Sequence, residues 1–528
     1  MADPNPTSTS NGNVIAAARL AIAQLGMSLR WQQANLPDVK SSIAVLSLAF
    51  LVTAPVRSAP PDPALVQPLA AHPPVVTHLK GRFNGEKVAY TARVESLDVK
   101  DENGETRIVS FAYTRDGVKS HSQRPVTFLF NGGPIVPSQW VHLGGLGPYR
   151  VAVPDDVRAD PATFKVVENV HSPLDATDLV FVDPASTGWS RVVTGTAPDA
   201  YFSVKADAQQ FVAFIRTWLA THARSQAPVY LFGESYGTNR AAEIAGQVAD
   251  APAAFNLKGI FLYGQAANIL EYAQRPANIT SYAVSLPTLA AIAWYHGKVD
   301  RRARTQDDFV EESRRFAANE YLPALFQGNR LPQAERERIA ARLEQLSGIP
   351  VAWYLAHDLR ITKEEFRVEL LKDRGLLLGR SDARYVAPIG PKGRADDPAT
   401  VLATTVQALF ETYRRATLHV DWPEPYLSDP PVADLDGWDW NGGRSPFGDW
   451  PYYQRITKLM SVNPQLRVVV GNGWYDTMTT MGAAQLLVSQ SGWDPARTRL
   501  RFYDGGHTGY SVEATARQIG DDIREMVR

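Results

Sequence analysis

The stretch that most constrains the fold lies at residues 228–247, PVYLFGESYGTNRAAEIAGQ. It begins with an apolar run at 229–232 that is long enough for a buried strand. The chain then passes through GESYG into an alanine-rich pattern that predicts a helix from about Asn239. A Gly-x-Ser-x-Gly turn between a strand and a helix is typical of a serine nucleophile, here Ser235, held at the tip of a strained turn. Such pentapeptides also occur in ordinary turns, so it is the flanking strand and helix that favour this interpretation.

The composition predicts a large globular protein. With 528 residues, 45% of them hydrophobic and 21% charged, the chain is long enough for one α/β domain with an insertion or for two domains. Its formal net charge is -1 and it contains no long basic run, so we expect no nucleic-acid partner. The absence of cysteine excludes disulfides, thiolate nucleophiles and cysteine metal sites.

Residues 41–59, SSIAVLSLAFLVTAPVRSA, resemble a targeting signal. Their apolar core is about ten residues, whereas a membrane-spanning helix needs roughly twenty, so we expect no stable membrane anchor. The segment follows Arg30 and Lys40 and leads to a Ser58-Ala59 step, which predicts a bacterial signal peptide and a periplasmic or secreted protein. About 40 residues precede the segment, so Met27 is an alternative start. The other interpretation is a short buried helix in a cytoplasmic protein that keeps this segment.

The order of the remaining elements indicates an α/β fold. We expect residues 1–75 to be a disordered, signal-like N-terminal region followed by an extended linker. The predicted elements are a hairpin at 87–97 and 106–114, strands at 126–130, 178–182, 257–263, 467–470 and 498–503, and helices at 204–223, 334–346, 363–373 and 514–527. We therefore predict a mostly parallel sheet built from residues 76–268 and 457–528, with residues 269–456 inserted as a helical cap. An independent second domain is the alternative, but the return of the strand pattern favours an insertion.

Two polar residues that follow late strands complete a candidate catalytic triad with Ser235. A serine hydroxyl needs a base within hydrogen-bond reach, and an acid orients that base. Asp476 follows the strand at 467–470 and His507 follows the strand at 498–503, which is the Ser-Asp-His order of α/β-hydrolases. Because parallel strands end at one edge of a sheet, we expect these side chains to meet. Asp504 is the competing acid, but a residue in the same turn as His507 would find it harder to approach the far ring nitrogen.

Five ordered motifs resemble those of the serine carboxypeptidase (S10 peptidase) family of α/β-hydrolases. They are NGGP at 131–134, DPASTGWS at 183–190, GESYG at 233–237, GNGWYD at 471–476 and GGH at 505–507. The likeness extends from about Lys87 to the C-terminus and is closer to the bacterial branch, whose members lack disulfides. It implies that Ser235 is the nucleophile, His507 the general base and then acid, and Asp476 the orienting carboxylate.

The resemblance also implies how the substrate is held. The backbone N–H groups of Gly133 and Tyr236 would form the oxyanion hole. Asn131 and Glu234 would bind the terminal carboxylate of the substrate, and Glu234 would do so only when protonated. Burial next to the nucleophile would raise the pKa of Glu234, which agrees with that role. A structural role for Glu234, in which it accepts backbone hydrogen bonds within the turn, is the alternative.

Three positions depart from the family pattern. Residues 135–138 are IVPS where the family has small residues. Gly145 stands where eukaryotic members have a second glutamate. After the histidine, Thr508-Gly509-Tyr510 replaces a methionine-containing pair. All three lie in segments that we expect to recognise the substrate. Serine hydrolysis is therefore better supported than removal of a C-terminal amino acid.

The sequence thus predicts a serine-type carboxypeptidase that cleaves peptides or N-acyl amino acids through an acyl-enzyme. An esterase, amidase or acyltransferase with the same triad is the alternative, and a non-catalytic binding protein is the alternative from another class. No HExxH motif, phosphate loop or dinucleotide fingerprint occurs, so no metal or cofactor is predicted.

Overall fold

The computed structural model describes residues 69–390, 397–429, 431–432, 435–441 and 452–528. The predicted signal segment at 41–59 lies outside these residues. The strands of the main sheet are β1 (Val75–Phe83), β2 (Glu86–Lys100), β3 (Glu105–Arg115), β4 (Val126–Phe130), β7 (Asp178–Val182), β8 (Arg191–Val192), β9 (Val229–Glu234), β10 (Leu257–Tyr263), β13 (Arg467–Gly473) and β14 (Thr498–Tyr503).

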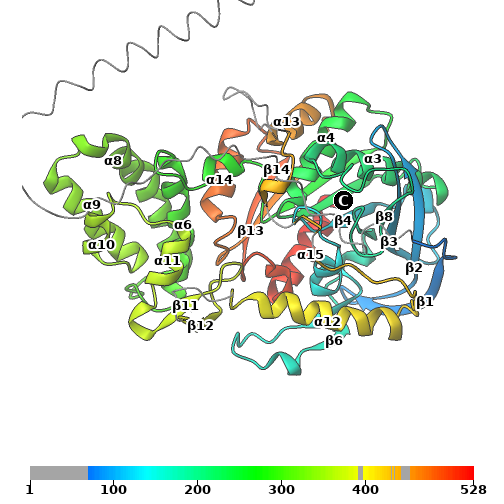
Figure 1. Cartoon of the computed structure of the whole chain (residues 1–528), viewed down its shortest axis with the longest axis horizontal. Helices are drawn as coiled ribbons and strands as arrows, with labels where there is room; N and C mark the ends of the chain where they lie inside the picture. The colour runs from blue at the N-terminus through cyan, green and yellow to red at the C-terminus, as the bar shows by residue number, and fades with distance from the viewer. Residues whose placement is uncertain (1–68, 391–396, 430, 433–434, 442–451) are drawn as a thin grey trace, which may run out of the picture. The chain divides into compact units, whose positions relative to one another are not determined.

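These ten strands form one sheet in the order β1-β2-β3-β7-β4-β9-β10-β13-β14, and β8 pairs with β3 (Figure 1). The strands at the β1 end, as far as the β3–β7 pair, are antiparallel. From β7 to β14 every neighbouring pair is parallel. This mostly parallel sheet confirms the predicted α/β-hydrolase fold, and it brings the ends of β4, β9, β13 and β14 to one edge.

Both faces of the sheet are buried. Within β4, Phe128 and Phe130 belong to one apolar cluster and Leu129 to the other, as the alternation of side chains along a strand requires. Helices α3 (Val204–Thr221), α4 (Gly237–Asp250), α13 (Tyr452–Val462) and α14 (Met481–Gln490) contribute to the first cluster, and α12 (Thr400–Ala416) and α15 (Glu513–Val527) to the second. Burial on both faces explains why the parallel strands are continuous apolar runs in the sequence.

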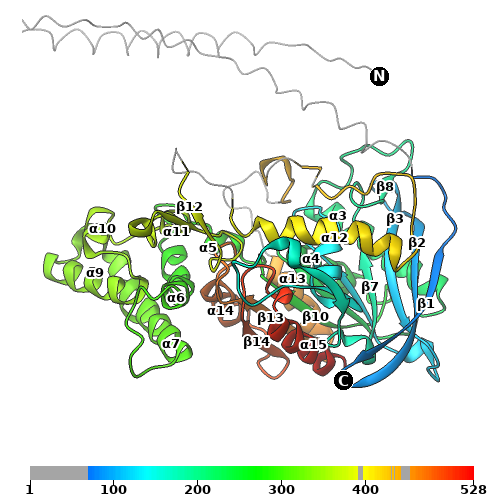
Figure 2. The same ribbon diagram turned by 90° about the horizontal axis from the view of Figure 1, so that it is seen from below.

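A third apolar cluster holds together a helical lobe (Figure 2). It extends from Tyr282 to Ala383 and includes Tyr475 and Met481, which follow β13. The helices here are α5 (Ile269–Tyr272), α6 (Ile279–Tyr295), α7 (Gln306–Phe316), α8 (Leu322–Gln327), α9 (Gln333–Ser347), α10 (Val351–Ala356) and α11 (Lys363–Glu369). The lobe lies between β10 and β13 in the chain, where the sequence predicts a helical insertion, whereas α12 packs on the sheet. The boundaries at 269 and 456 stay a prediction.

Most predicted elements are confirmed, and one is shorter than predicted. The strands at 126–130, 178–182, 257–263 and 498–503 coincide with β4, β7, β10 and β14. The helix predicted at 363–373 ends at Glu369, because Leu370 and Leu371 enter the lobe core and Gly375 turns the chain with a φ of 67°. Two short hairpins complete the fold, β5 (Tyr149–Ala152) with β6 (Lys165–Glu168) and β11 (Leu376–Leu378) with β12 (Val386–Pro388). No helix in the described ranges has the length and apolarity needed to cross a membrane.

Candidate active site

The turn between β9 and α4 has the strained geometry that the sequence predicts. Ser235 has a φ of 57°, in the left-handed region that L-residues seldom adopt. A Cβ atom at Gly233 would lie 2.3 Å from the carbonyl oxygen of Gly237, so only glycine allows the two backbones to approach this closely. Ser235 is partly exposed, while Glu234 and Tyr236 on either side are buried. The turn therefore presents the serine hydroxyl and buries its neighbours.

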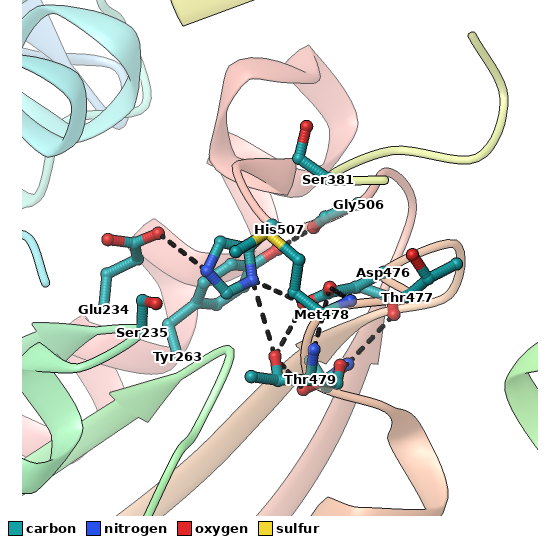
Figure 3. Close-up of polar contacts among 12 residues, drawn as sticks. Glu234, Ser235, Tyr263, Ser381, Asp476, Thr477, Met478, Thr479, Gly506 and His507 are labelled. Carbon is teal, nitrogen blue, oxygen red and sulfur yellow. Dashed lines mark hydrogen bonds and ion pairs between the residues drawn. The ribbon is translucent and has the colours of Figure 1, made fainter. Parts of the chain in front are cut away.

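His507 and Asp476 meet at the ends of the neighbouring strands β13 and β14 (Figure 3). The Nδ1 atom of His507 lies 2.7 Å from Oδ2 of Asp476. The backbone N–H of His507 donates to the carbonyl oxygen of Ser381 in the helical lobe at 2.6 Å. The competing acid, Asp504, is exposed. The carboxylate against the imidazole is thus that of Asp476.

Asp476 is fully buried and its hydrogen bonds are saturated. Its Oδ1 atom accepts from the backbone N–H groups of Met478 at 2.8 Å and Thr479 at 3.0 Å. Its Oδ2 atom accepts from the Thr479 hydroxyl at 2.7 Å, in addition to the contact with His507. Four donors converge on one buried carboxylate, which fixes its orientation.

The second ring nitrogen of His507 is open toward the serine turn. Nε2 is buried, lies 3.4 Å from Oε1 of Glu234 and has no hydrogen-bond partner in the described part of the chain. Figure 3 shows Ser235 on the same side of the imidazole as Glu234. The structure therefore brings Ser235, His507 and Asp476 to one place and leaves the nitrogen that faces the serine turn unbonded.

The two carboxylates on either side of the imidazole control its charge. Burial by itself lowers the pKa of His507, but the carboxylates of Asp476 and Glu234 outweigh burial and raise this pKa to about 9. Burial raises the pKa of Glu234, and the charge of His507 and the hydrogen bonds from Asn131 and Gly132 reduce that effect. Charge on Glu234 thus favours the protonated imidazole, and protonation of Glu234 removes this influence.

The loop after β4 carries the predicted oxyanion-hole and substrate-binding residues to the serine turn. Asn131 donates from Nδ2 to Oε2 of Glu234 at 2.9 Å, and the N–H of Gly132 donates to the same oxygen at 3.3 Å. A Cβ atom at Gly132 would lie 2.4 Å from the backbone nitrogen of Tyr236. Within the described ranges the N–H groups of Gly133 and Tyr236 donate no hydrogen bond. Two unused donors are therefore present beside Ser235.

A buried ion pair behind this loop was not predicted from the sequence. Arg240 is fully buried and donates from Nε to Oδ2 of Asp207 at 2.8 Å and from Nη1 to the carbonyl oxygen of Asn131 at 2.8 Å. The hydroxyl of Tyr236 donates to the same Asp207 oxygen at 3.0 Å. One salt bridge thus connects α3, α4 and the loop after β4. The available signal was helical spacing, because Arg240 precedes the apolar Ile244 by one turn.

Two of the departures from the family pattern belong to one structural feature. A Cβ atom at Gly145 would lie 2.5 Å from Cδ2 of Tyr510, so the tyrosine ring fills the space that a larger residue at 145 would need. The Tyr510 hydroxyl in turn lies 3.3 Å from Nδ2 of Asn131. The remaining departure, at residues 135–138, includes Ser138. Its backbone N–H and its hydroxyl both donate to Oδ1 of Asp183, each at 2.8 Å. These two bonds connect the loop after β4 to the DPASTGWS motif.

No group of three or more histidine, aspartate or glutamate side chains placed to hold a metal ion occurs among the described residues.

Comparison with known proteins shows a similarity over part of the chain. Residues 99–318 match the family model for serine carboxypeptidases. This segment of the chain is therefore similar to serine carboxypeptidases. The matched residues include Ser235, Asn131 and Glu234, while Asp476 and His507 lie beyond them.

The curated relatives match over short segments. Serine-type carboxypeptidase F of Aspergillus niger is 28% identical over 161 residues, which are 30% of this chain and 28% of the relative. The pheromone-processing carboxypeptidase KEX1 of Colletotrichum graminicola is 34% identical over 119 residues, which are 22% of this chain and 17% of the relative. The match thus spans less than a third of either relative's length.

Among solved structures, the crystal structure of KEX1(delta)P, a prohormone-processing carboxypeptidase from Saccharomyces cerevisiae, is 14% identical in sequence. The superposition covers 82% of this chain and 91% of that chain with a TM-score of 0.46.

Proposed function

We propose that this protein is a serine hydrolase in which Ser235 attacks an acyl carbonyl carbon and forms an acyl-enzyme. The observation that supports this proposal best is the arrangement of His507. One ring nitrogen is held by Asp476 at 2.7 Å, and the other, on the side of the serine turn, has no hydrogen-bond partner among the described residues and lies 3.4 Å from Oε1 of Glu234. A base that is oriented at one nitrogen and free at the other is what serine activation requires.

In the proposed mechanism, Nε2 of neutral His507 accepts the proton of the Ser235 hydroxyl as Oγ bonds to the carbonyl carbon. The negative charge that develops on the carbonyl oxygen is stabilised by the N–H groups of Gly133 and Tyr236, which have no other acceptor within the described residues. Asp476 stabilises the imidazolium. His507 then gives its proton to the leaving group, and the bond between that group and the acyl carbon breaks. A water molecule, deprotonated by His507, releases the acyl group in the same way.

Within this activity we propose a carboxypeptidase that acts on peptides or N-acyl amino acids. The names of the curated relatives and the family match support this choice. Asn131 and Glu234, which are hydrogen-bonded to each other at the end of β4 and β9, would bind the terminal carboxylate. Because burial raises the pKa of Glu234, its protonated form can donate a hydrogen bond to that carboxylate under acidic conditions.

One observation favours an esterase or amidase as the second candidate. The Tyr510 ring occupies the space beside Gly145, so a second carboxyl group does not accompany Glu234 at this position. A site with one carboxyl group has fewer donors for a substrate carboxylate at low pH, and it would accept esters or amides that lack one.

Labelling with a fluorophosphonate probe tests the nucleophile. We expect the probe to bond to Ser235, as identified by mass spectrometry of the peptide, and we expect Ser235→Ala to abolish labelling without unfolding the protein. Folded wild-type protein that does not react would contradict the proposal and would favour a non-catalytic binding protein on the same fold.

Hydrolysis of three matched substrates separates the two enzyme candidates. The set is a blocked dipeptide with a free terminal carboxylate, its C-terminal amide and a simple acyl ester. A preference for the free acid that grows as the pH falls supports the carboxypeptidase. Equal rates with and without the carboxylate support the esterase or amidase.

We also propose that the protein is exported, because residues 41–59 resemble a signal peptide. Expression of the full chain in a Gram-negative host, followed by N-terminal sequencing of the periplasmic protein, should place the new N-terminus near residue 60. Protein that stays in the cytoplasm with this segment intact would contradict this proposal.

A further inference from the structure

A lysine of the helical lobe reaches the loop that carries Asp476. Lys363 is the first residue of α11, and its backbone N–H donates to Oε1 of Gln274 at 2.7 Å. Its ammonium group donates to the carbonyl oxygen of Met478 at 3.0 Å, two residues beyond Asp476. Figure 3 shows the Met478 side chain beside His507. The lysine thus brings a positive charge from the lobe to the edge of the sheet where the triad lies.

The surroundings of this ammonium group are poor in acceptors. Lys363 is partly buried, its Nζ atom lies 5.3 Å from the centre of the Tyr272 ring, and burial lowers its pKa to about 8. An ammonium group has three donors, and only the bond to Met478 is made to an acceptor in the described part of the chain. A partly buried cation with unused donors is costly unless an anion pairs with it.

The carboxylates whose charge reaches Lys363 are already bound to other cations. They are Asp476 and Glu364. Asp476 is bound to His507, and Glu364 bonds to Nε of Arg380 at 3.0 Å and to Nη1 of Arg367 at 2.5 Å. No described carboxylate lies within ion-pair distance of the Lys363 ammonium, since its contacts are to a carbonyl oxygen and an aromatic ring. Among the described residues, no carboxylate therefore pairs with this ammonium group.

We propose that Lys363 is a specificity-determining residue of the Ser235 site and binds a carboxylate carried by the substrate. The proposal rests on the proposed function, because it places the substrate between the lobe and the triad, where ligands bind in open α/β folds. The carboxylate is either the C-terminal group of a peptide or N-acyl amino acid or an acidic side chain next to the scissile bond. Both would supply a pairing anion and use the two free donors.

The test compares wild type with Lys363→Gln, which keeps a donor for the Met478 carbonyl but removes the charge, and with Lys363→Arg, which keeps the charge. Lys372→Gln is the matched control, because Lys372 lies in the same lobe, is exposed and is bonded to Glu369. The substrates are a blocked dipeptide with a free terminal carboxylate, the same dipeptide as its C-terminal amide, that amide with a glutamate next to the scissile bond, and a neutral acyl ester. Fluorophosphonate labelling of each variant reports whether Ser235 is intact.

We expect Lys363→Gln to lower kcat/KM on the order of 10- to 100-fold for substrates with the recognised carboxylate, which corresponds to one charged hydrogen bond. The neutral ester and the labelling rate should change by less than about threefold, and Lys363→Arg should restore most of the loss. Loss on the free acid alone identifies the terminal carboxylate, and loss on the glutamate substrate alone identifies the side chain.

Equal losses on charged and neutral substrates would show that Lys363 only supports the Asp476 loop and would overturn the proposal. So would unchanged kinetics on every carboxylate substrate. If wild-type protein neither hydrolyses the neutral ester nor reacts with the probe, the proposed function fails and this inference fails with it. Ester hydrolysis with no effect of the charge at 363 contradicts this inference alone.

Discussion

The two sides of His507 differ in how completely their polar groups are used. On the Asp476 side, four donors saturate a fully buried carboxylate. On the Glu234 side, Nε2 is unbonded and the nearest carboxylate oxygen lies 3.4 Å away. On the first side every carboxylate oxygen accepts hydrogen bonds from the protein. On the second side a buried ring nitrogen has no hydrogen-bond partner among the described residues. Since unpaired buried polar atoms are costly, the open side is where we expect a substrate to bind.

A substitution on the saturated side should have the largest effect. Asp476→Asn keeps the shape of the side chain but removes the charge that stabilises the imidazolium. We expect kcat for the neutral ester to fall on the order of 10³- to 10⁴-fold, with the thermal transition still cooperative. Steady-state kinetics and calorimetry measure the two quantities.

The matched control for this variant is Asp504→Asn, because Asp504 is exposed and lies in the turn that carries His507. Its activity should stay within about threefold of wild type. If Asp504→Asn lost as much activity as Asp476→Asn, the assignment of the orienting carboxylate would be wrong.

The ion pair behind the open side should matter for stability. Asp207→Asn leaves the fully buried Arg240 without a counter-charge and weakens the contact with Tyr236. We expect the free energy of unfolding to fall by about 3–5 kcal/mol, measured by denaturant titration. Asp156→Asn, at an exposed ion pair with Arg158, should leave the unfolding midpoint unchanged. Equal effects of the two substitutions would show that the buried pair has no special role in the fold.

A single donor to Asp476 should have a smaller effect. Thr479→Val removes the 2.7 Å hydrogen bond to Oδ2 and leaves the other three contacts of the carboxylate. We expect a loss of kcat of roughly tenfold, as one hydrogen bond to a charged group predicts. Thr479→Ser, which keeps the hydroxyl, should restore most of the rate, and equal losses for both variants would indicate a packing effect instead.

A substitution of Glu234 should shift the dependence of ester hydrolysis on pH. Among the substitutions considered, it should change the maximal rate on the neutral ester least. The Glu234 carboxylate is one of the groups that raise the pKa of His507 to about 9. Glu234→Gln should lower that pKa, so more imidazole is neutral at a given pH and the acid limb of the profile moves to lower pH by about one unit. The difference from wild type should shrink where Glu234 is itself protonated. A limb that stays in place or moves to higher pH would contradict the electrostatic description of the site.

The sequence predicted the parts of the site that depend on strand ends. The apolar runs before Ser235, Asp476 and His507 are visible in one dimension, and parallel pairing then brings their ends to one edge of the sheet. Contacts that depend on side-chain direction were not predictable in this way. Helical spacing places Arg240 on the same face as the apolar Ile244, but an arginine in a helix is ordinarily exposed, so its burial was not predicted.

The link between Gly145 and Tyr510 shows the same limit. Each residue departs from the family pattern, but nothing in the sequence shows that the Tyr510 ring fills the space above Gly145. Lys363 lies in the helix that the sequence predicts at 363–373, and its contact with the Met478 carbonyl depends on how the lobe packs against the loops after β13. Side-chain contacts between segments that are distant in the sequence are thus the part of the site that the sequence does not predict.

The measurement that tests the account most directly is a crystal structure of the protein after reaction with a fluorophosphonate. We predict a phosphorus–oxygen bond to Oγ of Ser235, a phosphonyl oxygen within hydrogen-bond distance of the N–H groups of Gly133 and Tyr236, and Nε2 of His507 directed at the adduct while Nδ1 stays bonded to Asp476. An adduct on another residue, or one on Ser235 with the imidazole turned away and the two N–H groups bonded elsewhere, would contradict the assignment of the site.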